Sequence, residues 1–142
     1  METTDPLDSQ RDDRPAVLVI EDDIDNQNVY EIMLQDRYEV LSAANGEDMR
    51  THLRAANARI VAVLVDLALV GSEDGFTLTR YLRQQPGWAQ IPIIAITAHV
   101  FPEWRDRALE AGCDAFLTKP ISLTKLRDIL EQLVAEHASK PS

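Results

Sequence analysis

After a polar start, short apolar runs alternate with amphipathic stretches along the chain. Residues 16–20, 60–65 and 91–96 are continuous apolar runs rich in β-branched side chains. Such runs are typical of strands that are covered on both faces of a parallel sheet. Weaker runs at 38–43 and 114–118 predict an edge strand and a short fifth strand. The pattern therefore predicts five strands, each followed by a segment with a different period.

The segments that follow the predicted strands have the spacing of helices that bury one face. Their apolar faces consist of Val29, Ile32 and Met33; of Met49, Leu53 and Ala56; of Leu78, Tyr81 and Leu82; and of Trp104, Ala108 and Ala111. A fifth, longer stripe runs from Leu123 to Val134, and Ser122 is placed to cap its first turn. Strict alternation of strand and helix implies a parallel sheet with helices on both faces. We expect an α/β fold, a doubly wound sheet of five βα units.

Length and composition fit one domain. The chain has 142 residues, of which 45% are hydrophobic, so it can bury a sizeable core. We expect a domain at 15–138, a disordered acidic tail at 1–14 and a short tail at 139–142, with nothing left over for a second domain. No apolar run approaches the roughly 18 residues of a membrane span, and the start does not resemble a secretory signal. We therefore expect a cytoplasmic protein that does not enter a membrane.

The charge and the cysteine content narrow the choice of partners. The formal net charge is −10, with 24 acidic residues against 14 lysines and arginines. Such a surface disfavours nucleic acid, whose affinity for proteins comes largely from basic side chains on phosphates. The single cysteine, Cys113, offers no disulfide framework and fits a reducing compartment. We expect no nucleic-acid partner.

Polar side chains stand where the predicted strands end. Glu21 and Asp22 follow the first strand, Asp66 follows the third, Thr97 ends the fourth and Lys119 follows the fifth. Ligands of open α/β sheets bind outside the carboxyl ends of the strands, so these side chains should converge there. Neighbouring carboxylates repel each other unless a proton or a cation intervenes, and oxygen ligands without His or Cys favour Mg²⁺. The set suits phosphoryl transfer to a carboxylate.

In this order, the residues resemble the receiver domain of two-component response regulators, over about residues 15–137. In the resemblance, Glu21 and Asp22 correspond to the acidic pair, and Asp66 to the aspartate that accepts the phosphoryl group. Thr97 corresponds to the switch hydroxyl, and Lys119 to the lysine that precedes a usually cis proline. Weaker matches are the aromatic switch position Phe116, the Asp74–Gly75 turn and Asn26 near the start of the first helix.

The resemblance implies a flavodoxin-like sheet with strand order 2-1-3-4-5. It also implies Mg²⁺, for which Mn²⁺ could substitute, held by Asp22, Asp66 and the backbone carbonyl of Ala68, with Glu21 contributing through water. A histidine kinase or a histidine phosphotransfer protein would donate the phosphoryl group. A downstream protein would bind the fourth helix, fifth strand and fifth helix of a stand-alone receiver that is a monomer or a phosphorylation-dependent dimer.

The sequence departs from the usual receiver pattern after Asp66. Gly75 follows nine positions on, one more than is usual, and the customary Met-Pro is missing. Ala68 and His99 occupy the two positions where the family tunes hydrolysis of its acyl phosphate.

Other functions fit less well. A phosphatase of the haloacid-dehalogenase type needs a second aspartate where Ala68 stands, and no glycine-rich loop for a dinucleotide follows the first strand. An adaptor with the receiver fold that works without phosphorylation remains the alternative, and the altered loop is its best support.

Overall fold

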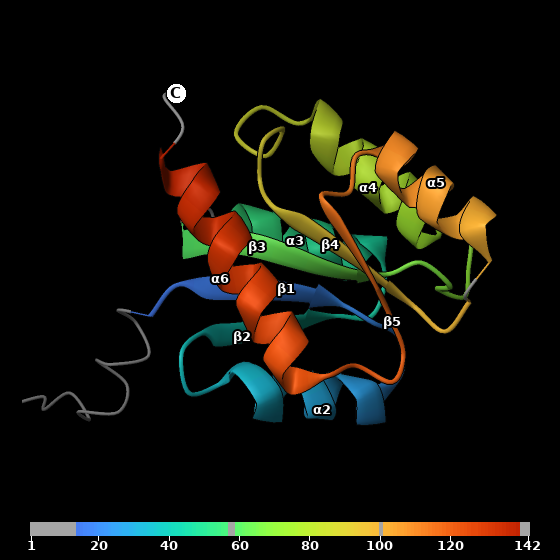
Figure 1. Ribbon diagram of the computed structural model, residues 1–142. Helices are drawn as coiled ribbons and strands as arrows, with labels where there is room; N and C mark the ends of the chain where they lie inside the picture. Colours follow the sequence, from blue (N-terminus) through green and yellow to red (C-terminus); the bar gives the residue numbers. More distant parts are fainter. Residues whose placement is uncertain (1–13, 57–58, 100, 140–142) are drawn as a thin grey trace, which may run out of the picture.

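The computed structural model describes residues 14–56, 59–99 and 101–139 (Figure 1). The strands are β1 (Ala16–Ile20), β2 (Glu39–Ala43), β3 (Ile60–Asp66), β4 (Ile93–Thr97) and β5 (Ala115–Thr118). The helices are α2 (Ile24–Leu34), α3 (Gly46–Ala56), α4 (Gly75–Gln84), α5 (Pro102–Ala111) and α6 (Leu123–Ser139). The tail predictions for residues 1–13 and 140–142 lie outside the described residues. Arg14, assigned to the first tail, donates to the carbonyl of Tyr38 at 3.2 Å, and Ser139 still belongs to α6.

All five strands are parallel and lie in the order β2-β1-β3-β4-β5, so the predicted fold class and strand order are confirmed. The weak run at 38–43 forms the edge strand β2, as expected. The fourth strand begins at Ile93 rather than at residue 91. Pro92 has no N–H to give to the ladder, and its carbonyl accepts from Val63 at 2.9 Å where the pairing starts.

Two layers of helices enclose the sheet (Figure 1). Buried side chains of α3, α4 and α5 pack on one face of the sheet, around Met49, Leu78 and Ala108. Side chains of α2 and α6 pack on the other face, around Leu34 and Leu130. With both faces covered, β1 and β4 are buried at every position, which explains their unbroken apolar runs.

The predicted buried face of α2 is wrong for two of its three residues, and only Met33 packs, partly buried, against the core. Ile32 and Val29 are 70% and 45% exposed, whereas Tyr30 and Leu34 are buried. The helix carries apolar side chains all the way round, so spacing alone could not decide which of them meets the sheet. As a result, α2 presents an apolar outer surface directly after the first strand.

One arginine side chain bonds to groups at the end of the sheet where β4 and β5 begin. The guanidinium of Arg83 on α4 donates to the carbonyls of Gly112 and Ile91 and pairs with Asp114 at 2.9 Å. The same Asp114 carboxylate accepts the amide of Ile93 at 2.9 Å. These bonds fix the starts of both strands relative to each other. Across the part of the chain that is described, no helix is long and apolar enough to cross a membrane.

Candidate functional site

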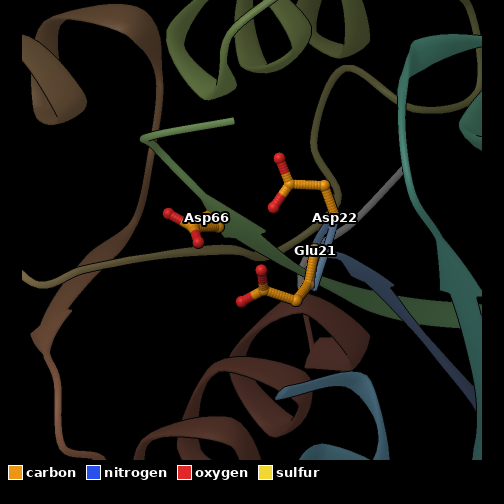
Figure 2. Close-up of side chains that lie close together, drawn as sticks. All are labelled: Glu21, Asp22 and Asp66. Atoms are coloured by element: carbon orange, nitrogen blue, oxygen red, sulfur yellow. The ribbon is translucent and has the colours of Figure 1, made fainter. Parts of the chain in front are cut away.

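The strand register brings two acidic side chains together at the carboxyl end of the sheet. Ile20 pairs with Val65, so Glu21 and Asp66, the next residue on each strand, stand side by side. Asp22 follows at once, and carboxylate oxygens of all three acids lie within 4.8 Å of one another (Figure 2). The predicted acidic cluster is therefore present in the fold.

The predicted lysine completes this cluster from the far edge of the sheet. Lys119 Nζ lies 3.0 Å from Asp66 Oδ2 and 3.2 Å from Glu21 Oε1. Its backbone amide donates to the carbonyl of Thr97 at 2.8 Å, which ties the end of β5 to β4. The following bond, Lys119–Pro120, is cis, as the resemblance implied. One ammonium thus neutralises part of a site with three carboxylates.

Burial and close charges shift the pKa values of two side chains at this site. Glu21 is only 1% exposed, and burial raises the pKa of its carboxyl above the ordinary value, against the opposing effect of the Asp23 amide. Burial would lower the pKa of Lys119, but its bonds to Asp66 and Glu21 outweigh this, and the pKa is raised overall. Lys119 therefore stays charged, and the negative charge that it leaves uncompensated favours a divalent cation.

Backbone groups hold the acidic side chains in place. Asp66 Oδ1 accepts the amide of Ala68 at 2.9 Å. Glu21 Oε2 accepts the amide of Asp23 at 3.2 Å, and Asp23 itself caps the start of α2. Behind Asp66, Gly75 packs so closely that a Cβ there would lie 2.5 Å from the Asp66 carbonyl oxygen. Only glycine lets α4 begin at this position.

Thr97 stands at the same end of the sheet, fully buried, but turned to its own loop. Its hydroxyl oxygen accepts the amide of His99 at 3.1 Å. The exposed His99 ring stacks on Trp104 of α5, with ring centroids 4.3 Å apart. Phe116 on β5 is partly buried against the core layer of α3, α4 and α5. None of these three predicted residues bonds to Asp66 within the described part of the chain.

Two contacts and one buried side chain at the site were missed by reasoning from sequence. The Val70 amide donates to Asp22 Oδ2 at 2.9 Å, and Gln27 Nε2 donates to the Glu21 carbonyl at 2.6 Å. Tyr30 is buried beside the site, and burial raises the pKa of its hydroxyl to about 12. A backbone donor leaves no trace in residue type, so nothing in the sequence marks Val70.

The sequence pattern of the response regulator receiver domain matches residues 17–131. This match covers most of the 142 residues, and the chain therefore belongs to the response regulator receiver domain family. Receivers are signalling domains rather than members of an enzyme class.

Solved structures and curated relatives agree with this assignment. The chain is similar to the receiver domain of a sensor histidine kinase from Pseudomonas aeruginosa, a structure described with a magnesium ion in its active site cleft. The identity is 33%, the TM-score is 0.74, and the match covers 86% of this chain and 98% of that one. The polar-differentiation response regulator DivK of Brucella anthropi is 23% identical over 85% of this chain and 97% of its own length.

Some relatives are much longer than the matched region. The response regulator PleD of Caulobacter vibrioides is 33% identical over 87% of this chain, yet the match spans only 29% of PleD. The chain likewise spans 5% of hybrid signal transduction histidine kinase M of Dictyostelium discoideum. The similarity to these proteins therefore covers only a part of each of them.

Proposed function

We propose that this receiver accepts a phosphoryl group on Asp66 from a phosphohistidine and passes the signal on by protein contact. The observation that supports this most directly is that Lys119 forms ion pairs with both Asp66 and Glu21 at the carboxyl end of the sheet. An ordinary polar strand end does not need a lysine from the far edge of the sheet and a buried glutamate beside it. A phosphoryl group on Asp66 would carry negative charge, which Lys119 and a cation held by the acidic residues would offset.

In the proposed reaction, an oxygen of Asp66 attacks the phosphorus of the donor phosphohistidine. The oxygen–phosphorus bond forms as the nitrogen–phosphorus bond breaks, and the donor imidazole leaves with the bonding electron pair. The Ala68 amide and Lys119 orient the attacking carboxylate beforehand. After transfer, Lys119 is free to pair with a phosphoryl oxygen, since the carboxyl group of the acyl phosphate no longer carries the carboxylate charge.

The residues at the site fit a magnesium ion. Three carboxylates with oxygens within 4.8 Å of one another supply hard oxygen ligands, and no thiol or imidazole stands among them. Asp22, Asp66 and the Ala68 carbonyl would hold the ion, with Glu21 contributing through water, and Mn²⁺ could replace it. The ion would supply charge neutralisation for the incoming phosphoryl group.

Phosphorylation would then act through Thr97. Its hydroxyl would move toward the phosphoryl oxygens, and Phe116 would follow into the vacated space, so that the surface of α5, β5 and α6 is repacked for a downstream protein. Ala68 and His99 flank the site at the positions that would set the lifetime of the acyl phosphate. The receiver would work as a monomer, or as a phosphorylation-dependent dimer formed through the same surface.

A histidine kinase or a histidine phosphotransfer protein is the proposed donor. The apolar outer surface of α2 supports this, because Ile24 and Ile32 are 65% and 70% exposed on the helix that follows the acidic pair. Beside it, a pocket of about 440 Å³ lies between α2 and the segment from Lys119 to Ile121. A helical donor could bury these side chains while presenting its histidine to Asp66.

Intact-protein mass after incubation with acetyl phosphate and Mg²⁺ tests the proposal. We expect the gain of one phosphoryl group, lost in Asp66→Asn and in a chelator control. Asp74→Asn is a matched control that should gain the group normally, since Asp74 caps α4 by accepting the Thr77 amide and is not one of the three clustered acids.

The alternative is an adaptor that works without phosphorylation, favoured only by the unusual loop after Asp66. Beryllofluoride mimics the phosphoryl group without being hydrolysed, so it detects a receiver whose phosphoryl group is lost quickly. Failure of both the mass gain and a Mg²⁺-dependent beryllofluoride complex would rule out the phosphorylation switch and leave the adaptor.

A further inference from the structure

The loop between β3 and α4 is tied to the acidic cluster by one backbone bond. The amide of Val70 donates to Asp22 Oδ2 at 2.9 Å, across 48 residues of sequence. The side chain of Val70 is 83% exposed, so packing of the side chain does not explain its position. Gly71 follows with a φ of 121°, a left-handed conformation that turns the chain directly after this amide.

The same loop is fixed a second time on the side of α3. Glu73 pairs with Arg50 through an Nη2–Oε2 distance of 2.5 Å and an Nη1–Oε1 distance of 3.3 Å. The Arg50 guanidinium also lies 4.7 Å from the centre of the Tyr81 ring on α4. Leu69, in the loop itself, is buried. The loop that carries the Val70 amide is therefore also tied to α3 through the Arg50–Glu73 pair.

The bond to Val70 uses one of the two carboxylate oxygens of Asp22. Only Oδ2 of this carboxylate is occupied by the amide, and Oδ1 has no hydrogen-bond partner among residues 14–56, 59–99 and 101–139. Asp22 is exposed, unlike Glu21 and Asp66, so burial does not restrict its rotation. A carboxylate that can turn away in water loses affinity for a cation through the entropy of ordering it.

We propose that Val70 is a positioning residue for the cation site: its amide holds Asp22 so that a carboxylate oxygen of Asp22 stays beside those of Glu21 and Asp66, and the Arg50–Glu73 pair holds the loop that carries this amide. The inference rests on the proposed Mg²⁺ site. Donors to a ligating carboxylate typically change metal affinity by about 10- to 100-fold when they are removed. By linkage, a partner that displaces the exposed loop at Val70 weakens cation binding, and the bound cation resists that displacement by the same factor.

The first test is Mg²⁺ affinity, measured by calorimetry with the metal alone on the full chain. Val70→Pro removes the N–H, and we expect it to weaken binding by about 10- to 100-fold. Val70→Ala keeps the N–H and should bind within twofold of the unchanged protein. Equal affinities of Val70→Pro and Val70→Ala would overturn the inference. No Mg²⁺ binding by the unchanged protein would instead overturn the proposed cation site, on which the inference depends.

A second measurement avoids the proline, which could distort the loop by itself. Amide hydrogen exchange without metal should show Val70 protected in the unchanged protein and exchanging faster in Asp22→Ala. The amide of Ser72, in the same loop, serves as the internal control and should not change. Glu73→Gln should lower Mg²⁺ affinity a few-fold. Unchanged exchange of Val70 in Asp22→Ala would show that Asp22 does not hold this amide and would overturn the inference.

Discussion

Lys119 reaches past β4 to place its ammonium nitrogen 3.0 Å from Oδ2 of Asp66. The same nitrogen lies 3.2 Å from Glu21 Oε1, so one lysine bridges the carboxylates that end β1 and β3. Lys119 therefore binds the same carboxylates that a cation would bind. The positive charges of the ammonium group and of the cation would repel each other.

Replacing Lys119 by Met should tighten Mg²⁺ binding, because it removes that repulsion. We expect a gain of roughly 3- to 30-fold, well below the full Coulomb energy of a close pair because the site is partly open to water. Calorimetric titration measures it. Lys125→Met removes an equal charge from an exposed position of α6 and should leave the affinity within twofold. Weaker binding by Lys119→Met would show that the lysine orders the carboxylates more than it competes with the ion.

Gly75→Ala should destabilise the fold by about 1–3 kcal/mol. The new Cβ would lie 2.5 Å from the Asp66 carbonyl oxygen and 2.6 Å from Leu67 Cα, and neither backbone atom can yield cheaply. Urea unfolding measures the change, with Thr77→Ala in the same helix as a control that should stay within about 0.5 kcal/mol. A stability equal to that of the control would mean that the start of α4 can shift away from Asp66 at no cost.

Trp104 should report the movement of Thr97. The Thr97 hydroxyl accepts the amide of His99, whose ring stacks on Trp104, so a displacement of Thr97 should disturb the stack. In a Trp88→Phe background, Mg²⁺ with beryllofluoride should raise the emission of Trp104 as the imidazole leaves the indole. Adding Thr97→Ala should abolish this rise. An equal rise in the Thr97→Ala protein would mean that the stack responds to the site by a route other than Thr97.

Cys113 should make the fold less stable in alkali. Burial raises the pKa of this thiol from 9.0 to about 11, so between these values the folded chain keeps a proton that the unfolded chain has lost. Stability is therefore fully present below pH 9 and falls as the pH rises toward 11. Relative to Cys113→Ala, the free energy of unfolding should drop by roughly 1 kcal/mol between pH 8 and pH 10. Urea unfolding at both pH values measures it, and a constant difference between the two proteins would contradict the assigned burial of the thiol.

Much of the architecture and the acidic cluster followed from sequence, because both depend on strand ends. Parallel strands that alternate with helices put their carboxyl ends on one edge, so Glu21, Asp66 and Lys119 could be placed together without coordinates. Resemblance to a known family added the cis bond before Pro120 and the strand order. Both are present in the structure.

The remaining features depend on packing that periodicity does not encode. The buried face of α2 was assigned wrongly because Ile32 and Tyr30 are both apolar, and only contact with the sheet separates them. The stack of His99 on Trp104 and the bond from Val70 to Asp22 depend on loop conformation. In the last two cases the deciding group is a ring orientation or a backbone amide, which residue identity does not specify.

The long sequence separation of the site has a consequence for how the chain is handled in a cell. Lys119 bonds to Glu21 across 98 residues and to Asp66 across 53, so no contiguous fragment shorter than this span contains the arrangement. Under the proposed function, a fragment that lacks Glu21, Asp66 or Lys119 would therefore lack the complete phosphoryl-accepting site. Ions that bind only the native arrangement would also raise its free energy of unfolding by mass action. Competence to receive a signal would then serve as a check that the whole chain has folded.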